Sequence, residues 1–394
     1  MPFATMIRRG SCSIFWHNGA SICPPHRQAC PPEPEYPMPT RRHFLTSLAL
    51  SPLLLAGCSK PQTDIVEEGF TVFNMPMTLR FANESARAIT QTVNAAASIV
   101  EPLYKSIHPW KPSDLTRLNA ELAATGRGTA TPYIIELIAI SRQLFEASLG
   151  TFDPTIGALI AAWGFHSSHV TEPHALPSEA FLDAWLKNPP SMNDVSVNGL
   201  EVRVTNRRVQ FDFNGCAEGF AGHLVIQAAE QAGIKNCLFD TGGDLFMIGQ
   251  AGDKPWHLAI ENPLKRSVLA SIDLSGHTAA NGHQSLNSSG NYEHRFIYKG
   301  EAYSHIINPK TARPVRRVAG STVWANHYGI SDGATKGVMM LEPAELPLMI
   351  QKLQLQGVLF MEERGDLWIS QRMRDQIKLI EPIADLRALH LIPD

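Results

Sequence analysis

Short apolar segments bounded by turn residues fill the second half of the chain, and they restrict its fold more than any other feature. Tight turns such as Thr241-Gly242-Gly243-Asp244 join neighbouring segments as hairpins. We expect strands near 236–240, 255–261, 268–274, 295–299, 318–324, 356–361 and 366–370. Because the expected strands outnumber the helices and many are linked by hairpins, the predicted class is α+β, with mixed and antiparallel sheets and packed helices.

Helical periodicity is clearest after Ser85. Apolar residues recur there at spacings of four and three, which is one face of an amphipathic helix. They are Ile89, Val93, Ala96, Val100 and Leu103. Pro102 is expected to kink or end this helix. Further helices are expected over 131–148, over 216–232 and from near Asp332.

Less regular segments complete the prediction. A strand is expected over 73–81, and a strand pair over 202–213 around a turn at Asn206-Arg207. Residues 166–200 are rich in His, Pro, Ser and Asn, and we expect them to cross the surface. Within them, His166-Ser167-Ser168-His169 and His174 are interpreted as a solvated loop rather than a zinc site.

The composition indicates a globular protein that does not bind nucleic acid. The chain has 394 residues, of which 44 % are hydrophobic and 18 % are charged. Its formal net charge is −3 and its pI is about 6.6. Binding to a polyanion requires a basic patch, and the sequence has none in its body. No nucleic-acid partner is therefore expected.

Residues 38–58 have the features of a bacterial export signal. Arg41-Arg42 precedes a short apolar run from Leu48 to Leu55, and Ala56-Gly57-Cys58 follows it. This order is typical of a signal segment, and the run is too short to span a membrane. The arginines with Phe44-Leu45 resemble a twin-arginine signal. The small residues before Cys58 resemble a lipoprotein box, and a buried helix with fortuitous arginines is the alternative.

We therefore expect an exported protein on the periplasmic side of a bacterial membrane, held there by lipid on Cys58. Translation starts at Met1 or at Met38. Residues 1–57 are interpreted as an upstream segment and export signal, 58–70 as a linker and 71–394 as the functional domain.

The cysteines give little further guidance. Cys12, Cys23 and Cys30 lie in a Pro-rich opening, where their spacing fits no standard zinc module, although metal binding stays an alternative. Cys216 and Cys237 lie in apolar segments and are expected to be buried thiols rather than a disulfide.

Segments of polar residues and glycine at the ends of the expected elements carry the functional signal. Asp212-Phe213-Asn214-Gly215-Cys216-Ala217-Glu218-Gly219-Phe220 opens a helix, where backbone N–H groups can receive phosphate oxygens. The others are Phe152-Asp153-Pro154-Thr155 with Trp163-Gly164-Phe165, Asp240-Thr241-Gly242-Gly243-Asp244, His305-Ile306-Ile307-Asn308-Pro309, and Ser106 to Asn119 with Trp110.

In order and spacing, these segments resemble the motifs of the FAD:protein FMN transferases, the ApbE family, from about Phe73 to Leu341. The resemblance implies an enzyme of the ApbE-like fold that holds FAD with its diphosphate near a magnesium ion. A Thr or Ser hydroxyl of a partner redox protein would attack the flavin-side phosphorus, so that FMN becomes attached to the partner and AMP leaves.

The resemblance also implies roles for single residues. Asp212 and Glu218 match positions that hold the nucleotide. Flavin and adenine contacts are implied for Met75, Trp110, Thr151, Phe152, Asp153 and Ile306. As alternatives, Met75 and Ile306 are core residues and Trp110 covers a surface edge. The implied metal ligands are the Asp332 carboxylate and the Gly215 carbonyl. His305 is the candidate base for the acceptor hydroxyl, or else a structural histidine at a strand end.

Three departures from the family pattern concern the metal site and its surroundings. The metal-site helix of the family has a Thr four residues after its Asp, where this chain has Lys336. Thr335 substitutes as a ligand through a shifted turn, or the cation is held more weakly, or Lys336 contacts a phosphate in its place. Asn308 replaces the family's Asp, and Ala312 replaces a Gly.

Two other functions therefore stay open. One is a periplasmic lipoprotein that binds FAD without transferring it, which Lys336 favours. The other is a pyrophosphatase that splits FAD into FMN and AMP with water as the acceptor.

Overall fold

A nine-stranded sheet is the centre of the computed structural model, which describes residues 64–72, 75–167, 176–275, 283–380, 382 and 386–394. Its strands, in spatial order, are β1 (Ile65–Val72), β2 (Met75–Ala82), β6 (Cys237–Asp240), β7 (Leu245–Ile248), β10 (His283–Gly290), β15 (Val318–Ala325), β16 (Gly357–Glu362), β17 (Asp366–Ser370) and β19 (Ala388–Ile392). Neighbouring strands pair antiparallel except β17 and β19, which are parallel.

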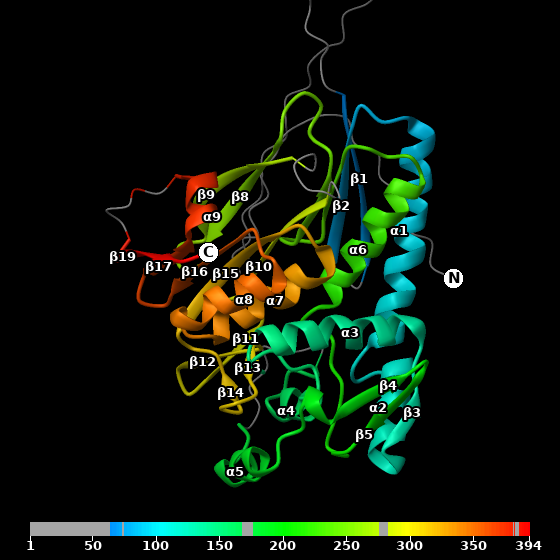
Figure 1. Cartoon of the computed structure of the whole chain (residues 1–394), viewed down its shortest axis with the longest axis vertical. Helices are drawn as coiled ribbons and strands as arrows, with labels where there is room; N and C mark the ends of the chain where they lie inside the picture. Colours follow the sequence, from blue (N-terminus) through cyan, green and yellow to red (C-terminus); the bar gives the residue numbers. More distant parts are fainter. Residues whose placement is uncertain (1–63, 73–74, 168–175, 276–282, 381, 383–385) are drawn as a thin grey trace, which may run out of the picture. The chain divides into compact units, whose positions relative to one another are not determined.

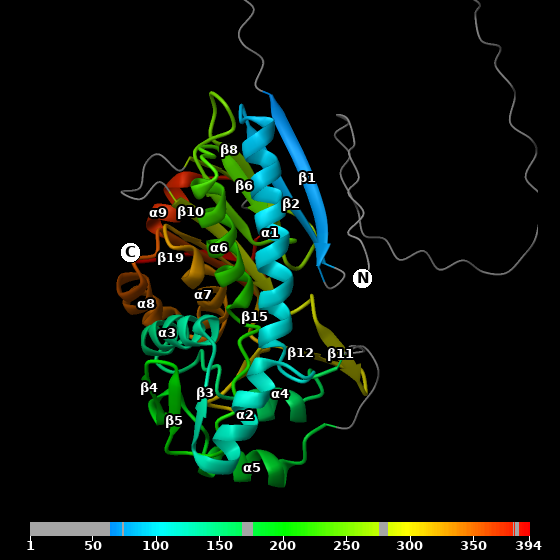
Figure 2. The same ribbon diagram turned by 90° about the vertical axis from the view of Figure 1, so that its right-hand side faces the viewer.

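Three helices pack against one face of this sheet: α1 (Ala86–Ile107), α6 (Ala217–Gln231) and α7 (Tyr328–Met340). Figure 2 shows α6 between the other two. Gly222 allows α6 to lie close to the sheet, because a Cβ there would be 2.5 Å from the ring of Phe246 on β7. The approach places the first turn of α6 beside α7.

The other face of the sheet is covered by a smaller sheet of β8 (Trp256–Asn262), β9 (Ser267–Leu274) and β18 (Ile377–Leu379), with α9 (Gln371–Gln376). Alternation along β6 produces both cores: Phe239 packs in the cluster that includes α1 and α6, and Leu238 packs in the cluster that includes β8. The central sheet is therefore buried on both faces, as Figure 1 shows.

The remaining elements lie beyond one end of the sheet, with α3 against α7 and α8 (Figure 1). The helices are α2 (Asp114–Thr125), α3 (Pro132–Ala147), α4 (Gly157–Ala162), α5 (Glu179–Lys187) and α8 (Leu346–Leu353), with 3-10 turns at Met192–Asp194 and Pro343–Glu345. The strands are β3 (Arg127–Thr129), β4 (Val195–Asn198), β5 (Glu201–Val204), β11 (Arg295–Tyr298), β12 (Glu301–Ser304), β13 (Ile307–Asn308) and β14 (Arg313–Pro314).

The predicted α+β class is confirmed, and so are the helices at 85–107, 131–148 and 216–232. Ser85 caps α1 by accepting the Ala88 N–H at 3.3 Å. Cys216 and Cys237 are buried free thiols, as expected.

Four local predictions are wrong. Of the two expectations for Pro102, the helix end is wrong, because α1 continues for five more residues to Ile107. The predicted linker is shorter at its end, since residues 65–70 belong to β1 and pair with β2. The strand pair over 202–213 does not form; β5 ends at Val204 and pairs with β3 and β4 instead. Residues 166–200 are not only surface loop, because α5 buries Trp185.

The predicted export signal, Cys58 and the histidines at 169 and 174 lie outside the described residues. Within the described part of the chain, no helix combines the length and apolar character that a membrane span requires.

Candidate active site

Asp332 links α7 to the first turn of α6. Its side chain is 1 % exposed, and Oδ2 accepts the backbone N–H of Gly219 at 2.9 Å. Backbone N–H groups in the first turn of a helix lack an intrahelical acceptor and attract negative charge. The carboxylate therefore completes the start of α6 while it stays on α7.

Lys336 lies one helical turn after Asp332 and forms an ion pair with it. The ammonium nitrogen Nζ contacts Asp332 Oδ1 and donates to the Asp332 carbonyl oxygen at 3.2 Å. Side chains four residues apart share a helix face, so the pair follows from the sequence spacing. Burial acts to lower the pKa of Lys336, but Asp332 and Asp244 outweigh it and leave this pKa above its usual value. The buried ammonium is therefore charged.

Two more carboxyl groups lie around this pair. Burial, followed by the negative charge of Asp332, raises the pKa of Glu218 to about 7, while Lys336 acts in the opposite direction. Burial also raises the pKa of Asp244 well above its usual value, and Asp332 and Glu218 raise it further. One ammonium cannot neutralise all these carboxylates, so Glu218 and Asp244 keep their protons to higher pH than exposed carboxyl groups do.

The turn between β6 and β7 places Asp244 in this cluster. Gly242 and Gly243 have φ values of 103° and 135°, a region that other residues rarely adopt. Their N–H groups donate to Asp240 Oδ1 at 2.9 and 3.2 Å. The turn directs Asp244 inward, where its Oδ1 accepts the N–H of Ser288 at 3.1 Å.

The Thr335 side chain makes different contacts from those of Lys336, the next residue in the helix. Its hydroxyl donates to the Asp332 carbonyl at 2.6 Å and lies 2.6 Å from the hydroxyl of Ser289 on β10. The side chain is fully buried. The hydroxyl of this predicted ligand is therefore bound to protein atoms.

These contacts test whether the expected magnesium ion fits. Magnesium requires oxygen ligands in a near-octahedral arrangement. One oxygen of Asp332 contacts an ammonium group, the other accepts an N–H, and the hydroxyl of Thr335 is engaged. Among the residues that the structure describes, no group of three or more His, Cys, Asp or Glu side chains is arranged to hold a metal ion. The residues as they stand do not fit magnesium.

An aromatic stack lies against Asp212. The His166 ring stacks on Trp110 at 5.2 Å between centroids, with 24° between the planes, and its Nε2 is 2.8 Å from Asp212 Oδ2. The other oxygen of Asp212 accepts the N–H of Asn214 at 2.9 Å. Asp212 and His166 have side chains that are 1 % and 9 % exposed. The interpretation of His166 as part of a solvated loop is therefore wrong.

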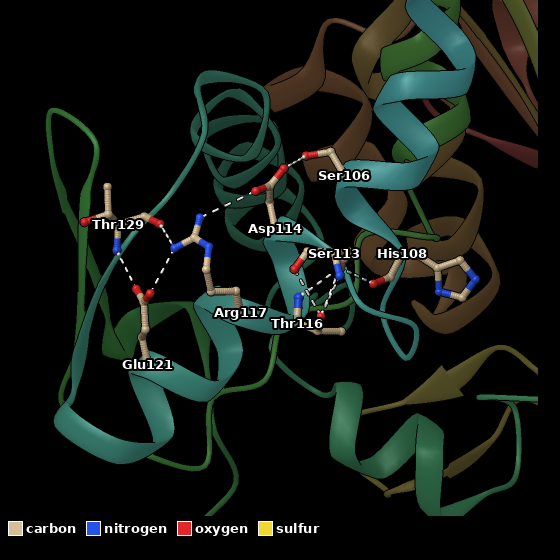
Figure 3. A network of polar contacts seen from close by, with 8 residues as sticks. All are labelled: Ser106, His108, Ser113, Asp114, Thr116, Arg117, Glu121 and Thr129. Carbon is tan, nitrogen blue, oxygen red and sulfur yellow. Dashed lines mark hydrogen bonds and ion pairs between the residues drawn. The ribbon is translucent and has the colours of Figure 1, made fainter.

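The loop that carries Trp110 is fixed by the start of α2, as Figure 3 shows. Ser113 caps the helix in a reciprocal arrangement with Thr116, and its hydroxyl donates to the His108 carbonyl at 2.7 Å. Asp114 in the first turn accepts the hydroxyl of Ser106 at 2.7 Å. The His108 ring meets Trp110 edge-to-face at 4.4 Å. These hydrogen bonds fix the loop on which Trp110 lies.

The Thr151-Phe152-Asp153 segment is tied to its own loop. The Thr151 hydroxyl donates to the Ser148 carbonyl at 2.8 Å. Asp153 accepts the N–H and hydroxyl of Thr155 at 3.0 and 2.6 Å. Burial raises the pKa of Asp153 to about 6, and these hydrogen bonds limit the rise. Thr151 and Asp153 therefore shape the loop, whatever contacts they make with a ligand.

His305 is held in one orientation. Its Nδ1 lies 3.0 Å from the carbonyl oxygen of His294. A carbonyl only accepts, so Nδ1 carries the proton and Nε2 keeps a lone pair. Burial, His294 and Lys336, in that order, lower the pKa of His305 to about 3. The imidazole is neutral at pH 7.

The other predicted residues fall in three settings. Ile306 is 5 % exposed and belongs to the same hydrophobic cluster as Phe152. Gly215 precedes α6, and a Cβ there would be 3.2 Å from the Phe152 ring. Met75 starts β2 and pairs with Val72, and its side chain is outside the described part of the chain.

Charges of the cluster act on residues of two other predicted segments. Cys216, before α6, is fully buried, and burial raises its thiol pKa to about 12, an effect to which Asp332 adds. Lys336 contributes to the lowered pKa of His305. The direct link between the cluster and the segment that begins at Asp212 is the hydrogen bond from the Gly219 N–H to Asp332.

Sequence reasoning assigned no role to Asp244 and rejected His166. Asp244 is the last residue of the turn motif after β6, directly before β7, so the motif could have marked it as a site residue. His166 directly follows Trp163-Gly164-Phe165, but nothing in the sequence indicates that it returns to Asp212, 46 residues later.

Comparison with known proteins identifies relatives of the whole domain. The ApbE family model matches residues 73–360. An FAD:protein FMN transferase of Rhodobacter capsulatus is 31 % identical over 86 % of this chain, which spans 64 % of the length of that relative. One of Vibrio cholerae is 27 % identical over 76 % of this chain and 88 % of its own.

Solved structures agree with the fold. The apo flavinyl transferase ApbE of Pseudomonas stutzeri has a TM-score of 0.68 and 24 % identity, covering 80 % of this chain and 97 % of its own. The Thermotoga maritima ApbE protein has a TM-score of 0.67 and 22 % identity, over 80 % and 99 %. The family match over residues 73–360 shows that the chain belongs to the ApbE family.

Proposed function

We propose that this chain transfers the FMN part of FAD to a Ser or Thr hydroxyl of a partner protein and releases AMP. Its family and the curated relatives named FAD:protein FMN transferase support flavin transfer to a protein. The observation that carries the proposal is the match of the ApbE family model over residues 73–360, which include Asp212, His305 and Asp332.

The proposed step exchanges one phosphorus–oxygen bond for another. The acceptor hydroxyl oxygen forms a bond to the flavin-side phosphorus. The bond to the bridging diphosphate oxygen breaks, and AMP leaves with its electron pair. The acceptor proton passes through Nε2 of His305, whose lone pair is available because Nδ1 faces the His294 carbonyl, to a phosphate oxygen of the departing AMP.

Binding of FAD is proposed for the surroundings of Asp212 and Trp110. The stacked rings of Trp110 and His166 are proposed to offer an aromatic surface to a planar part of the ligand. The family resemblance also implies magnesium dependence. The contacts of the Asp332 carboxylate and the Thr335 hydroxyl with other protein atoms do not support it.

Incubation of the protein from residue 59 with FAD and an acceptor bearing a Ser-Gly-Ala-Thr segment tests the activity. Flavin fluorescence on the acceptor in a denaturing gel, with equimolar AMP in solution, supports the transferase. Free FMN and AMP without a labelled acceptor indicate a pyrophosphatase instead. Bound FAD that stays intact indicates a binding protein.

We also propose that the chain is exported and anchored by lipid on Cys58, on the periplasmic side of a membrane. The sequence of residues 38–58 supports this location. Metabolic labelling with a radioactive fatty acid tests it. Label in the wild type and its loss in Cys58→Ala support the anchor, and equal labelling of both proteins contradicts it.

A further inference from the structure

We propose that the ammonium group of Lys336 takes the place of a divalent cation in this chain, so that FMN transfer proceeds without a bound metal. The inference rests on the proposed function for the identity of the substrate. Its structural part, that Lys336 prevents metal binding, can be tested without any activity.

The first support for the inference is the position of Lys336. The side chain is 16 % exposed and its ammonium contacts a carboxylate that is 1 % exposed. The negative charges of Asp244, which is buried, and of Glu218, which is partly exposed, act on the same ammonium. A buried cluster of carboxylates is unstable without a positive charge, and in the described residues Lys336 supplies it from the protein itself.

The state of the oxygen atoms is the second support. A metal ion would have to displace Lys336 from Asp332 Oδ1 and compete with the Gly219 N–H at Oδ2. It would also have to detach the Thr335 hydroxyl from Ser289. A divalent cation bound to the same carboxylate would lie close to the Lys336 ammonium, and the two positive charges would repel each other. The side chain therefore excludes the metal by both charge and contact.

Lys336 also has the capacity to act on a phosphate. An ammonium has three N–H donors, and the contacts with Asp332 account for two of them. The third is available to a non-bridging oxygen of the FAD diphosphate. During transfer Lys336 keeps its proton, and its charge offsets the negative charge that develops as the bond to AMP breaks.

Titration with Mn²⁺, followed by electron paramagnetic resonance, tests the structural part. The wild type is expected to show no saturable binding up to about 1 mM, the weak end of protein cation sites. Lys336→Thr removes the ammonium and frees Asp332 Oδ1, so it is expected to gain one Mn²⁺ site and to melt at higher temperature with Mg²⁺.

Lys105→Thr is the matched control, because Lys105 forms an exposed pair with Glu101 at the same i,i+4 spacing. It is expected to gain no site. Stoichiometric Mn²⁺ binding by the wild type overturns the inference, even if Lys336→Thr does not fold. Equal weak binding by the wild type and a folded Lys336→Thr also overturns it.

Transfer assays in EDTA test the remaining part. The wild type is expected to label the acceptor at the same rate, within about twofold, in EDTA and in Mg²⁺. Loss of labelling in EDTA alone overturns the inference and leaves the transferase standing. No labelling in either buffer contradicts the proposed function, and the Mn²⁺ titration then decides whether Lys336 excludes the metal.

Discussion

The backbone N–H of Gly219 donates to Asp332 Oδ2 at 2.9 Å, so the first turn of α6 and the middle of α7 share one buried negative charge. The same carboxylate holds Lys336 through its other oxygen. Asp332 therefore supports the packing of two helices as well as the charge balance of the site.

Asp332→Ala is expected to lower the free energy of unfolding by about 3 kcal/mol, because it leaves a largely buried ammonium without its nearest partner. The double variant with Lys336→Met removes both charges and is expected to recover most of the loss. Urea unfolding of the wild type, of Asp332→Ala and Lys336→Met alone and of the double variant measures the coupling. Effects of the two single substitutions that add up to the effect of the double variant would show that the pair contributes nothing.

His305 is expected to make the fold less stable at acidic pH. Its pKa is lowered to about 3 in the folded state, below the value of about 6.5 in an unfolded chain. The unfolded state therefore binds a proton first as the pH falls below 6.5. Stability is fully present above this pH and is lost as the pH falls toward 3.

Comparison of the wild type with His305→Gln isolates this contribution. Between pH 7.5 and pH 5, urea unfolding of the wild type is expected to lose about 1–2 kcal/mol more than that of the variant. Identical pH dependence of the two proteins would mean that His305 titrates normally in the fold.

His166 is expected to affect FAD binding and stability through different contacts. His166→Phe keeps a ring for the stack on Trp110 but leaves one oxygen of the buried Asp212 without its partner. A loss of about 1–3 kcal/mol in unfolding free energy is expected. His166→Ala removes the stack as well and is expected to weaken FAD binding further, by flavin fluorescence quenching. Equal FAD affinity of the two variants would exclude a role for the stack.

Gly222→Ala tests the close approach of α6 to the sheet. The added Cβ would lie 2.5 Å from the Phe246 ring, so about 1–3 kcal/mol of destabilisation is expected. Gly69→Ala on β1 is the control, since its Cβ would lie at an ordinary 3.6 Å from the nearest atom. Thermal melting of both variants measures the difference, and an equal change in both would show that α6 moves away without cost.

Periodicity predicted the helices well because their buried faces repeat over several turns. In α1 the five residues that carry the period are all buried: Ile89, Val93, Ala96, Val100 and Leu103. The strand pattern was less informative around β5. Val202 is buried there, but the chain after β5 runs back to the loop of Thr155, where the Gln210 N–H donates to the Thr155 carbonyl. A strand pattern in sequence does not show whether a partner strand is present.

Contacts within the site could be predicted where both residues belong to one sequence motif and their spacing fixes the contact. Asp332 and Lys336 are four residues apart on one helix, so their contact followed from the sequence. The contact of His166 with Asp212 joins distant segments through tertiary packing, and no local rule predicts it. The same holds for Thr335 and Ser289, which meet only because α7 packs on β10.

The distances along the chain between Glu218, Asp244 and Asp332 have a consequence for folding. These residues come from α6, from the turn after β6 and from α7, so the chain must close long loops before their charges meet. While the protein is being synthesised, Glu218 and Asp244 cannot meet the positive charge of Lys336 until that residue has been added. The proposed nucleotide site is therefore complete only after α7 has been made.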